Sequence, residues 1–368
     1  MKQRLIEKIL LRLDSLNLRS VRSKLAALFY ESLPEQFAGL TDDERLDYGV
    51  LFQGLTQKAE SDPDAALRAL GVSCKETSLL FVPGFLADLL MATDKAGLKQ
   101  ELRRHTILGT YFDEQMEWLD SGGVVHHERV GVESQSAPVL NFRIIGEAVR
   151  AAPHPVILVT HSKGGIDALE WLLDEARKPS RESLVGKVRG VIAIQSPFFG
   201  SPVAGVIVAN RILRKLTSYS LTQLGGGPAA LQSLSRRWRC RFYNRYRSDI
   251  AAVLKQVPVL CYASSLSRGP EKNAFPLIET ARDIMERMRI PNDGLVPVHS
   301  AVLPGAAFVT TEGVDHAAPV MPTRLPFDRR AHLYALVEVM HSIIKERRGQ
   351  LFKRKADLPE CDCYTRKL

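Results

Sequence analysis

The stretch PVILVTHSKGG, residues 155–165, decides the fold of this chain. An apolar, β-branched run from Val156 to Thr160 meets a glycine-rich turn, and a helical pattern begins after Gly165. This order predicts a buried strand, a tight turn and a crossover helix, with Ser162 at the apex of the turn. Such a turn lifts a serine hydroxyl above the sheet edge and gathers backbone N–H groups around it. The stretch therefore predicts serine-based acyl transfer.

Strand-like and helical segments alternate along the rest of the chain, which has 368 residues and an apolar content of 45%. The alternating segments are 79–82, 124–132, 139–151, 156–160, 166–176 and 188–194, followed by strands 257–262 and 307–311 and a closing helix 329–345. Alternation of this kind predicts an α/β fold with a mostly parallel sheet and flanking helices. We expect this domain to cover residues 76–345.

Three other parts depart from the alternation. Residues 1–75 read as a helical N-terminal extension, which either packs on the main domain or lies on a membrane surface as an amphipathic helix. Residues 203–250 read as a cap or lid insertion. Its segment RRWRCRFYNRYR, residues 236–247, suits anionic lipid headgroups or polyanions, or equally a helix that covers apolar surface with arginine stems. Residues 346–368 form a basic C-terminal tail.

A serine nucleophile needs a histidine to take its proton and a carboxylate to orient that histidine. On a strand–turn–helix elbow the three follow in the chain order serine, acid, histidine, each after a strand. Asp293 lies in the turn PNDGLVP after the strand 257–262, and His316 lies in GVDH after the strand 307–311. We therefore predict that Ser162, Asp293 and His316 act together.

Other candidates fit these positions less well. No strand separates His299 from Asp293, and Asp315 is the immediate neighbour of the histidine that it would have to orient. His161 adjoins the serine and is expected to pack beneath the turn.

An oxyanion hole needs two backbone N–H donors. One is predicted to be Lys163, which follows the serine. The other is predicted in the loop after strand 79–82, where Pro83 has no N–H and Gly84 permits an unusual turn. Phe85 is the expected donor there, with Leu86 as the alternative.

Four segments in order resemble the α/β-hydrolase superfamily, and among its members the bacterial triacylglycerol lipases. They are VPGF at 82–85, THSKGG at 160–165, QSPFFGSPVA at 195–204 and NDGLVP at 292–297, the last leading to His316. The resemblance implies an α/β-hydrolase fold with a lid, Ser162 as nucleophile, Asp293 as acid and His316 as base.

Two departures from that pattern bear on function. Thr160 replaces the first glycine of the family's elbow, which places a bulkier residue at a crowded position. Ala317-Ala318-Pro319-Val320 follows the histidine where secreted bacterial lipases carry a calcium-binding aspartate, so we expect no calcium.

The N-terminus lacks the unbroken apolar core of a secretory signal, and the five cysteines form no disulfide framework. We expect a cytoplasmic protein, with peripheral contact to an anionic membrane as an open alternative.

These patterns predict an ester hydrolase that acts on a lipid or another acyl ester without a cofactor or metal. A thioesterase or acyltransferase would use the same residues. A non-catalytic interaction protein that keeps the fold is the alternative from another class. The net charge of +9 suits an anionic surface and does not require nucleic acid, which we do not expect as a partner.

Overall fold

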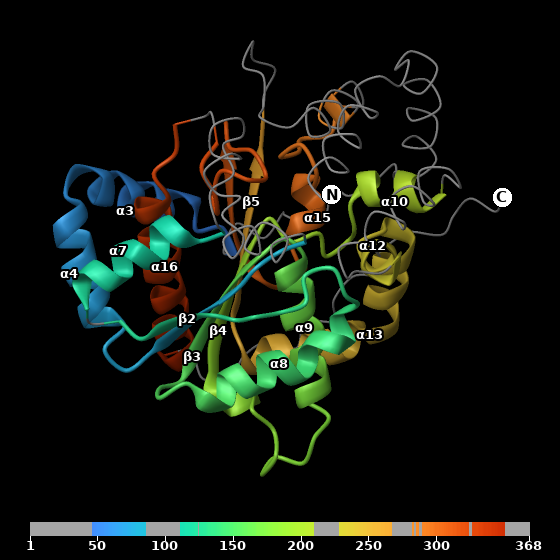
Figure 1. The fold of residues 1–368 in the computed structure, drawn as a ribbon, viewed down its shortest axis with the longest axis horizontal. Helices are drawn as coiled ribbons and strands as arrows, with labels where there is room; N and C mark the ends of the chain where they lie inside the picture. Colours follow the sequence, from blue (N-terminus) through green and yellow to red (C-terminus); the bar gives the residue numbers. More distant parts are fainter. Residues whose placement is uncertain are drawn as a thin grey trace, which may run out of the picture.

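The computed structural model describes residues 46–85, 111–123, 125–209, 228–266, 282, 285–286, 289–323 and 326–349. Six strands form one sheet in the order β2-β1-β3-β4-β5-β6, and all neighbours pair in parallel (Figure 1). The strands are β1 Ser78–Val82, β2 His127–Arg129, β3 Val156–His161, β4 Val188–Ile194, β5 Val259–Ser265 and β6 Ala307–Glu312. The predicted α/β fold with a parallel sheet is confirmed.

Helices cover both faces of this sheet (Figure 1). On one face lie α8 Pro138–Ala151, α9 Lys163–Glu175 and α13 Arg236–Gln256; on the other lie α3 Gly49–Ser61, α4 Pro63–Ser73, α7 Asp113–Gly122 and α16 Arg329–Gly349. The short helices are η3 Val185–Lys187, α10 Pro202–Ala209, α12 Pro228–Ser233 and α15 Val298–Ala301.

Strand β3 is buried along its whole length because both of its faces are covered. Leu158 joins the core beneath α8, α9 and α13, whereas Ile157 and Val159 join the core beneath α3, α4, α7 and α16. A strand with two covered faces needs apolar side chains at every position rather than at alternate ones. This explains the continuous apolar run that precedes Ser162.

The described part of the N-terminal extension packs on the sheet domain. Helix α4 begins at Pro63 after Asp62, whose side chain accepts a hydrogen bond from the Ala65 N–H at 2.9 Å. Phe52 of α3 lies in the same core as α16. Residues 1–45 of the predicted extension lie outside the described residues.

The segment 203–250 contains α10, α12 and the first part of α13, and its residues 210–227 lie outside the described part. Helix α13 is the crossover between β4 and β5, and its buried Arg239 forms an ion pair with Glu170 of α9. Cys240 is disulfide-bonded, whereas the sequence indicated no disulfide framework. Cys74 and Cys261 are free and buried.

Helix α16 continues to Gly349, past its expected end at residue 345; the remainder of the basic tail lies outside the described residues. No helix in the described ranges is long and apolar enough to cross a membrane.

Candidate active site

Ser162 occupies the turn between β3 and α9, with φ 51° and ψ −121°. A positive φ is strained for any residue with a Cβ and persists only where neighbours impose it. The Ser162 N–H donates to the carbonyl of Ile194 at 2.9 Å, and the Gly165 N–H donates to the Ser162 carbonyl at 3.2 Å. These bonds hold the backbone so that the serine stands at the apex of the turn.

The residues around the serine explain the unusual sequence of this turn. A Cβ at Gly164 would collide with the carbonyl oxygen of Val82, so only glycine fits beneath the serine. Thr160 is fully buried, and its hydroxyl donates to the carbonyl of Ile192 on β4 at 3.0 Å. The threonine that replaces the family's glycine is therefore accommodated by a bond to the neighbouring strand.

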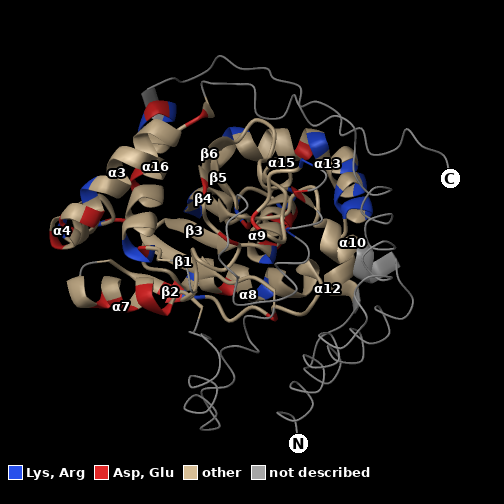
Figure 2. Ribbon diagram, turned by 90° about the horizontal axis from the view of Figure 1, so that it is seen from above, with Lys and Arg blue, Asp and Glu red and all other residues tan. Residues whose placement is uncertain are grey.

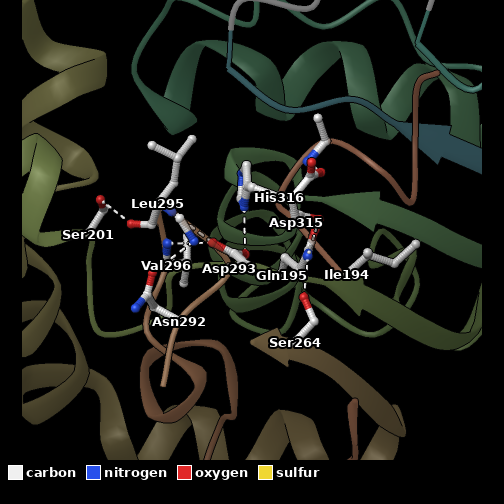
Figure 3. A network of polar contacts seen from close by, with 12 residues as sticks. Ile194, Gln195, Ser201, Ser264, Asn292, Asp293, Leu295, Val296, Asp315 and His316 are labelled. Carbon is white, nitrogen blue, oxygen red and sulfur yellow. Dashed lines mark hydrogen bonds and ion pairs between the residues drawn. The ribbon is translucent and has the colours of Figure 1, made fainter. Parts of the chain in front are cut away.

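Asp293 and His316 meet although 23 residues separate them in the chain. The Nδ1 atom of His316 lies 2.7 Å from Oδ2 of Asp293, a contact drawn as a dashed line in Figure 3. The Leu295 and Val296 N–H groups donate to Oδ1 of Asp293 at 2.9 and 2.7 Å. Because a carboxylate only accepts, Nδ1 of His316 carries its proton toward Asp293 and Nε2 is left to act as a base.

The histidine ring lies next to the elbow. The ring of His161, the residue before Ser162, stands 4.8 Å from the His316 ring, centroid to centroid. In the described part of the chain, no hydrogen bond links the Ser162 hydroxyl to His316. Bonds between nucleophile and base are often long in a free enzyme and shorten when substrate binds. The structure thus brings the three predicted residues to one sheet edge without closing the serine–histidine bond.

The predicted oxyanion loop lies directly against the serine. A Cβ at Gly84 would come within 2.9 Å of the Ser162 Cβ. Gly84 lies against the Tyr111 hydroxyl, 2.6 Å from where a Cβ would stand, and Phe85 has the next N–H along this loop. Phe85 and Lys163 remain the expected donors, and Leu86 lies outside the described residues.

The rejected candidates have other partners. Asp315 accepts hydrogen bonds from the Ala317 and Ala318 N–H groups at 2.8 and 2.7 Å, which shapes the loop after β6. His299 belongs to α15, where burial and nearby Arg236 lower its pKa to about 4.

Sequence reasoning missed a buried ion pair beneath the elbow. The Nζ atom of Lys163 is 2.8 and 2.7 Å from the two carboxylate oxygens of Asp167, and both side chains are inaccessible to solvent. Burial raises the pKa of Asp167, and the lysine opposes that rise. Asn141 also donates to Asp167, at 2.7 Å. The i,i+4 spacing was a visible signal, although such pairs usually lie on an exposed helix face.

Comparisons with known proteins bear mainly on the fold. No family model matches this chain. The crystal structure of a metagenomic carboxyl esterase aligns with a TM-score of 0.65 at 20% identity, covering 87% of this chain and 99% of that one. The mature form of a Bacillus licheniformis lipase aligns with a TM-score of 0.47 at 19% identity, over 66% of this chain and 85% of the lipase. Protein SERAC1 of Danio rerio is 26% identical over 165 residues, which are 45% of this chain and 24% of that protein. The matched part thus spans about a quarter of that relative's length.

Proposed function

We propose that this chain, which has the α/β-hydrolase fold, is a serine hydrolase that cleaves carboxylic esters through an acyl-enzyme. The observation that carries the proposal is the contact of 2.7 Å between His316 Nδ1 and Asp293 Oδ2, beside a strained turn that presents Ser162. A structural role alone would not require a histidine that a carboxylate holds through Nδ1 next to an elbow serine.

In the proposed reaction, His316 Nε2 takes the proton of the Ser162 hydroxyl while Oγ attacks the ester carbonyl carbon. The carbonyl oxygen becomes an oxyanion that the N–H groups of Phe85 and Lys163 stabilise. The tetrahedral intermediate collapses, its C–O bond to the alcohol breaks, and His316 gives the proton to the leaving alkoxide. Water, deprotonated by the same histidine, then hydrolyses the acyl-enzyme and releases the carboxylic acid.

The surroundings of Phe85 favour an apolar acyl group. Its ring packs against a small cluster of buried residues formed by Ile166, Ala204 and Leu234. Ile166 lies on the first turn of α9, four residues after Ser162, so this apolar wall is close to the reacting atoms. We infer that a hydrocarbon acyl chain contacts the half-buried Phe85 ring at the edge of this cluster, which supports a lipid-like substrate.

A panel of p-nitrophenyl esters with graded acyl length, together with a fluorophosphonate label, tests the proposal on the wild type and Ser162→Ala. We expect labelling and hydrolysis by the wild type alone. Labelling that persists in Ser162→Ala rejects the proposed nucleophile. Faster turnover of matched acyl-thioesters indicates a thioesterase, and a folded chain inert to every acyl probe indicates an interaction protein.

The exposed face of α13 supports contact with an anionic membrane. Arg237, Arg241 and Arg245 are exposed at helical spacing, and Trp238 between them has 45% of its surface exposed. Figure 2 shows the Lys and Arg positions along this helix in blue. Basic residues near an anionic bilayer contribute about 1 kcal/mol each, and tryptophan prefers the headgroup region. Co-sedimentation with phosphatidylserine vesicles, and not with neutral ones, is the expected result; equal binding to both contradicts it.

A further inference from the structure

Three consecutive backbone carbonyls in the loop that carries His316 are held by buried side chains from three neighbouring strand ends. His161 ends β3, Gln195 follows β4 and Ser264 lies near the end of β5. The bonds are His161 Nε2 to the His316 carbonyl, Gln195 Nε2 to the Asp315 carbonyl and Ser264 Oγ to the Val314 carbonyl, each at 2.9 Å. We call His161, Gln195 and Ser264 the carbonyl clamp; none is more than 2% exposed.

The clamp residues also bind one another. Gln195 Nε2 donates to Ser264 Oγ at 2.6 Å, and Gln195 Oε1 lies 3.2 Å from His161 Nε2 (Figure 3 shows Gln195 and Ser264). Gln195 has φ 49°, a backbone conformation that a residue with a side chain adopts only when its surroundings require it. The Gln195 side chain donates both of its amide hydrogens within this network, to Ser264 Oγ and to the Asp315 carbonyl.

The donor and the acceptor can be assigned for the hydrogen bonds at both ring nitrogens of His161. A carbonyl only accepts, so His161 Nε2 carries the proton and Nδ1 must accept. The Tyr111 hydroxyl lies 2.6 Å from Nδ1 and therefore donates to it, and the same hydroxyl lies against Gly84 of the oxyanion loop. Tyr111 thus links the oxyanion loop to the clamp, and burial lowers the pKa of His161 well below its usual value, which keeps the ring neutral.

We propose that the carbonyl clamp and Tyr111 are positioning residues for catalysis, which hold the His316 loop so that Nε2 faces the Ser162 hydroxyl. This inference rests on the proposed hydrolase function. None of the four side chains is given a step in the chemistry. Their effect is to fix the base, the elbow and the oxyanion loop relative to one another, because a displacement of about 1 Å at a reacting group can cost 100-fold in rate.

The test compares variants that differ in one bond of the network. Tyr111→Phe removes the hydroxyl and keeps the ring. Its matched control is Tyr262→Phe, because Tyr262 is also a buried residue and its hydroxyl also forms a bond of 2.6 Å, but to Thr311 on β6. We expect Tyr111→Phe to lower kcat roughly 10- to 100-fold per fluorophosphonate-titrated serine with KM changed less than twofold, and Tyr262→Phe to leave kcat within about twofold of wild type.

A second pair of variants separates hydrogen bonding from packing. His161→Leu removes both ring bonds, whereas the Gln amide of His161→Gln can donate to the His316 carbonyl and accept from Tyr111. We expect His161→Gln to regain most of the kcat that His161→Leu loses. Ser264→Ala deletes a single clamp donor, and its expected loss of kcat at constant KM provides the same test where His161→Leu does not fold.

Equal kcat values for wild type, Tyr111→Phe and Ser264→Ala would overturn the inference, as would equal losses in Tyr111→Phe and Tyr262→Phe. Failure of the proposed function looks different. In that case Ser162→Ala remains active, or the wild type shows no activity from which a loss can be measured.

Discussion

Asp293 holds His316 through one carboxylate oxygen while its other oxygen is bonded to the chain itself. Oδ2 faces His316 Nδ1 at 2.7 Å, and Oδ1 accepts the N–H groups of Leu295 and Val296. Two backbone donors on one oxygen prevent the carboxylate from exchanging its oxygens. The turn NDGLVP therefore does more than supply an acid, because it fixes which atom meets the histidine.

Replacing Asp293 with asparagine should remove most of the activity while the fold is kept. The Asn oxygen is expected to stay with the two backbone N–H groups, which turns the NH₂ toward His316 Nδ1. That nitrogen must then accept, so Nε2 carries the proton and cannot act as a base. We expect kcat on a p-nitrophenyl ester to fall about 10³- to 10⁴-fold, with little change in Tm.

Asp315→Asn is the matched control for this variant. Its oxygen can still accept the Ala317 and Ala318 N–H groups, so we expect nearly full activity. Similar losses in the two variants would contradict the assignment of Asp293.

Gly84→Ala should disturb the oxyanion loop. The added Cβ would lie 2.6 Å from the Tyr111 hydroxyl oxygen and 2.9 Å from the carbonyl oxygen of His161, closer than such atoms can stand. Moving the loop displaces the Phe85 N–H, so we expect a loss in kcat of roughly 10²- to 10³-fold. Gly186→Ala is the control, since nothing lies within 4 Å of its added Cβ. Unchanged kcat in Gly84→Ala would argue against this loop as an oxyanion donor.

Patterns local in the sequence predicted the fold and the placement of the three candidate residues. The apolar run 156–160 indicated β3. The expected chain order of serine, acid and histidine, each in a loop after a strand, selected Asp293 and His316, which the structure places in contact. Such patterns succeed because parallel strands bring their carboxyl ends to one edge.

The supporting network could not be predicted in the same way. Gln195 and Ser264 lie in segments remote from His316 in the chain, and only the sheet order makes them neighbours. Tyr111 follows a stretch without a recognisable pattern. The burial of the Lys163 side chain could not be predicted either, because a lysine is rarely fully buried unless it is paired, and the sequence alone did not identify Asp167 as its partner.

Replacing His332 should make stability less sensitive to acid. Its ring packs edge-on against Phe52 and Tyr262 and near Phe327, with centroids at 5.7, 4.5 and 5.1 Å. Burial, with a smaller effect from Arg329, lowers its pKa to about 3. Because the unfolded histidine binds a proton below pH 6.5 and the folded one does not, folding stability falls as pH drops from 6.5 toward 3.

The measurement is urea unfolding of the wild type and His332→Phe at pH 7.5 and pH 5. Between these values the wild type should lose about 2 kcal/mol more of its unfolding free energy than His332→Phe. The other titrating groups are common to both proteins, so their contributions cancel when the two losses of unfolding free energy are compared. Parallel losses in the two proteins would show that His332 binds protons equally well in both states.

Removing one partner of the buried pair Lys163–Asp167 should cost more than removing both charges. Lys163→Met leaves the Asp167 carboxylate without its hydrogen-bonded cation in a site closed to water, so we expect a loss of about 3–5 kcal/mol in unfolding free energy. Adding Asp167→Asn neutralises that site and keeps an acceptor for Asn141, so the double variant should recover at least half of the loss. Arg143→Met is the control, because Arg143 and Glu147 have the same i,i+4 spacing on an exposed face and are worth roughly 0.5 kcal/mol. Urea denaturation at pH 7 measures all three variants. A double variant no more stable than Lys163→Met would show that the lysine acts through packing of its stem rather than through its charge.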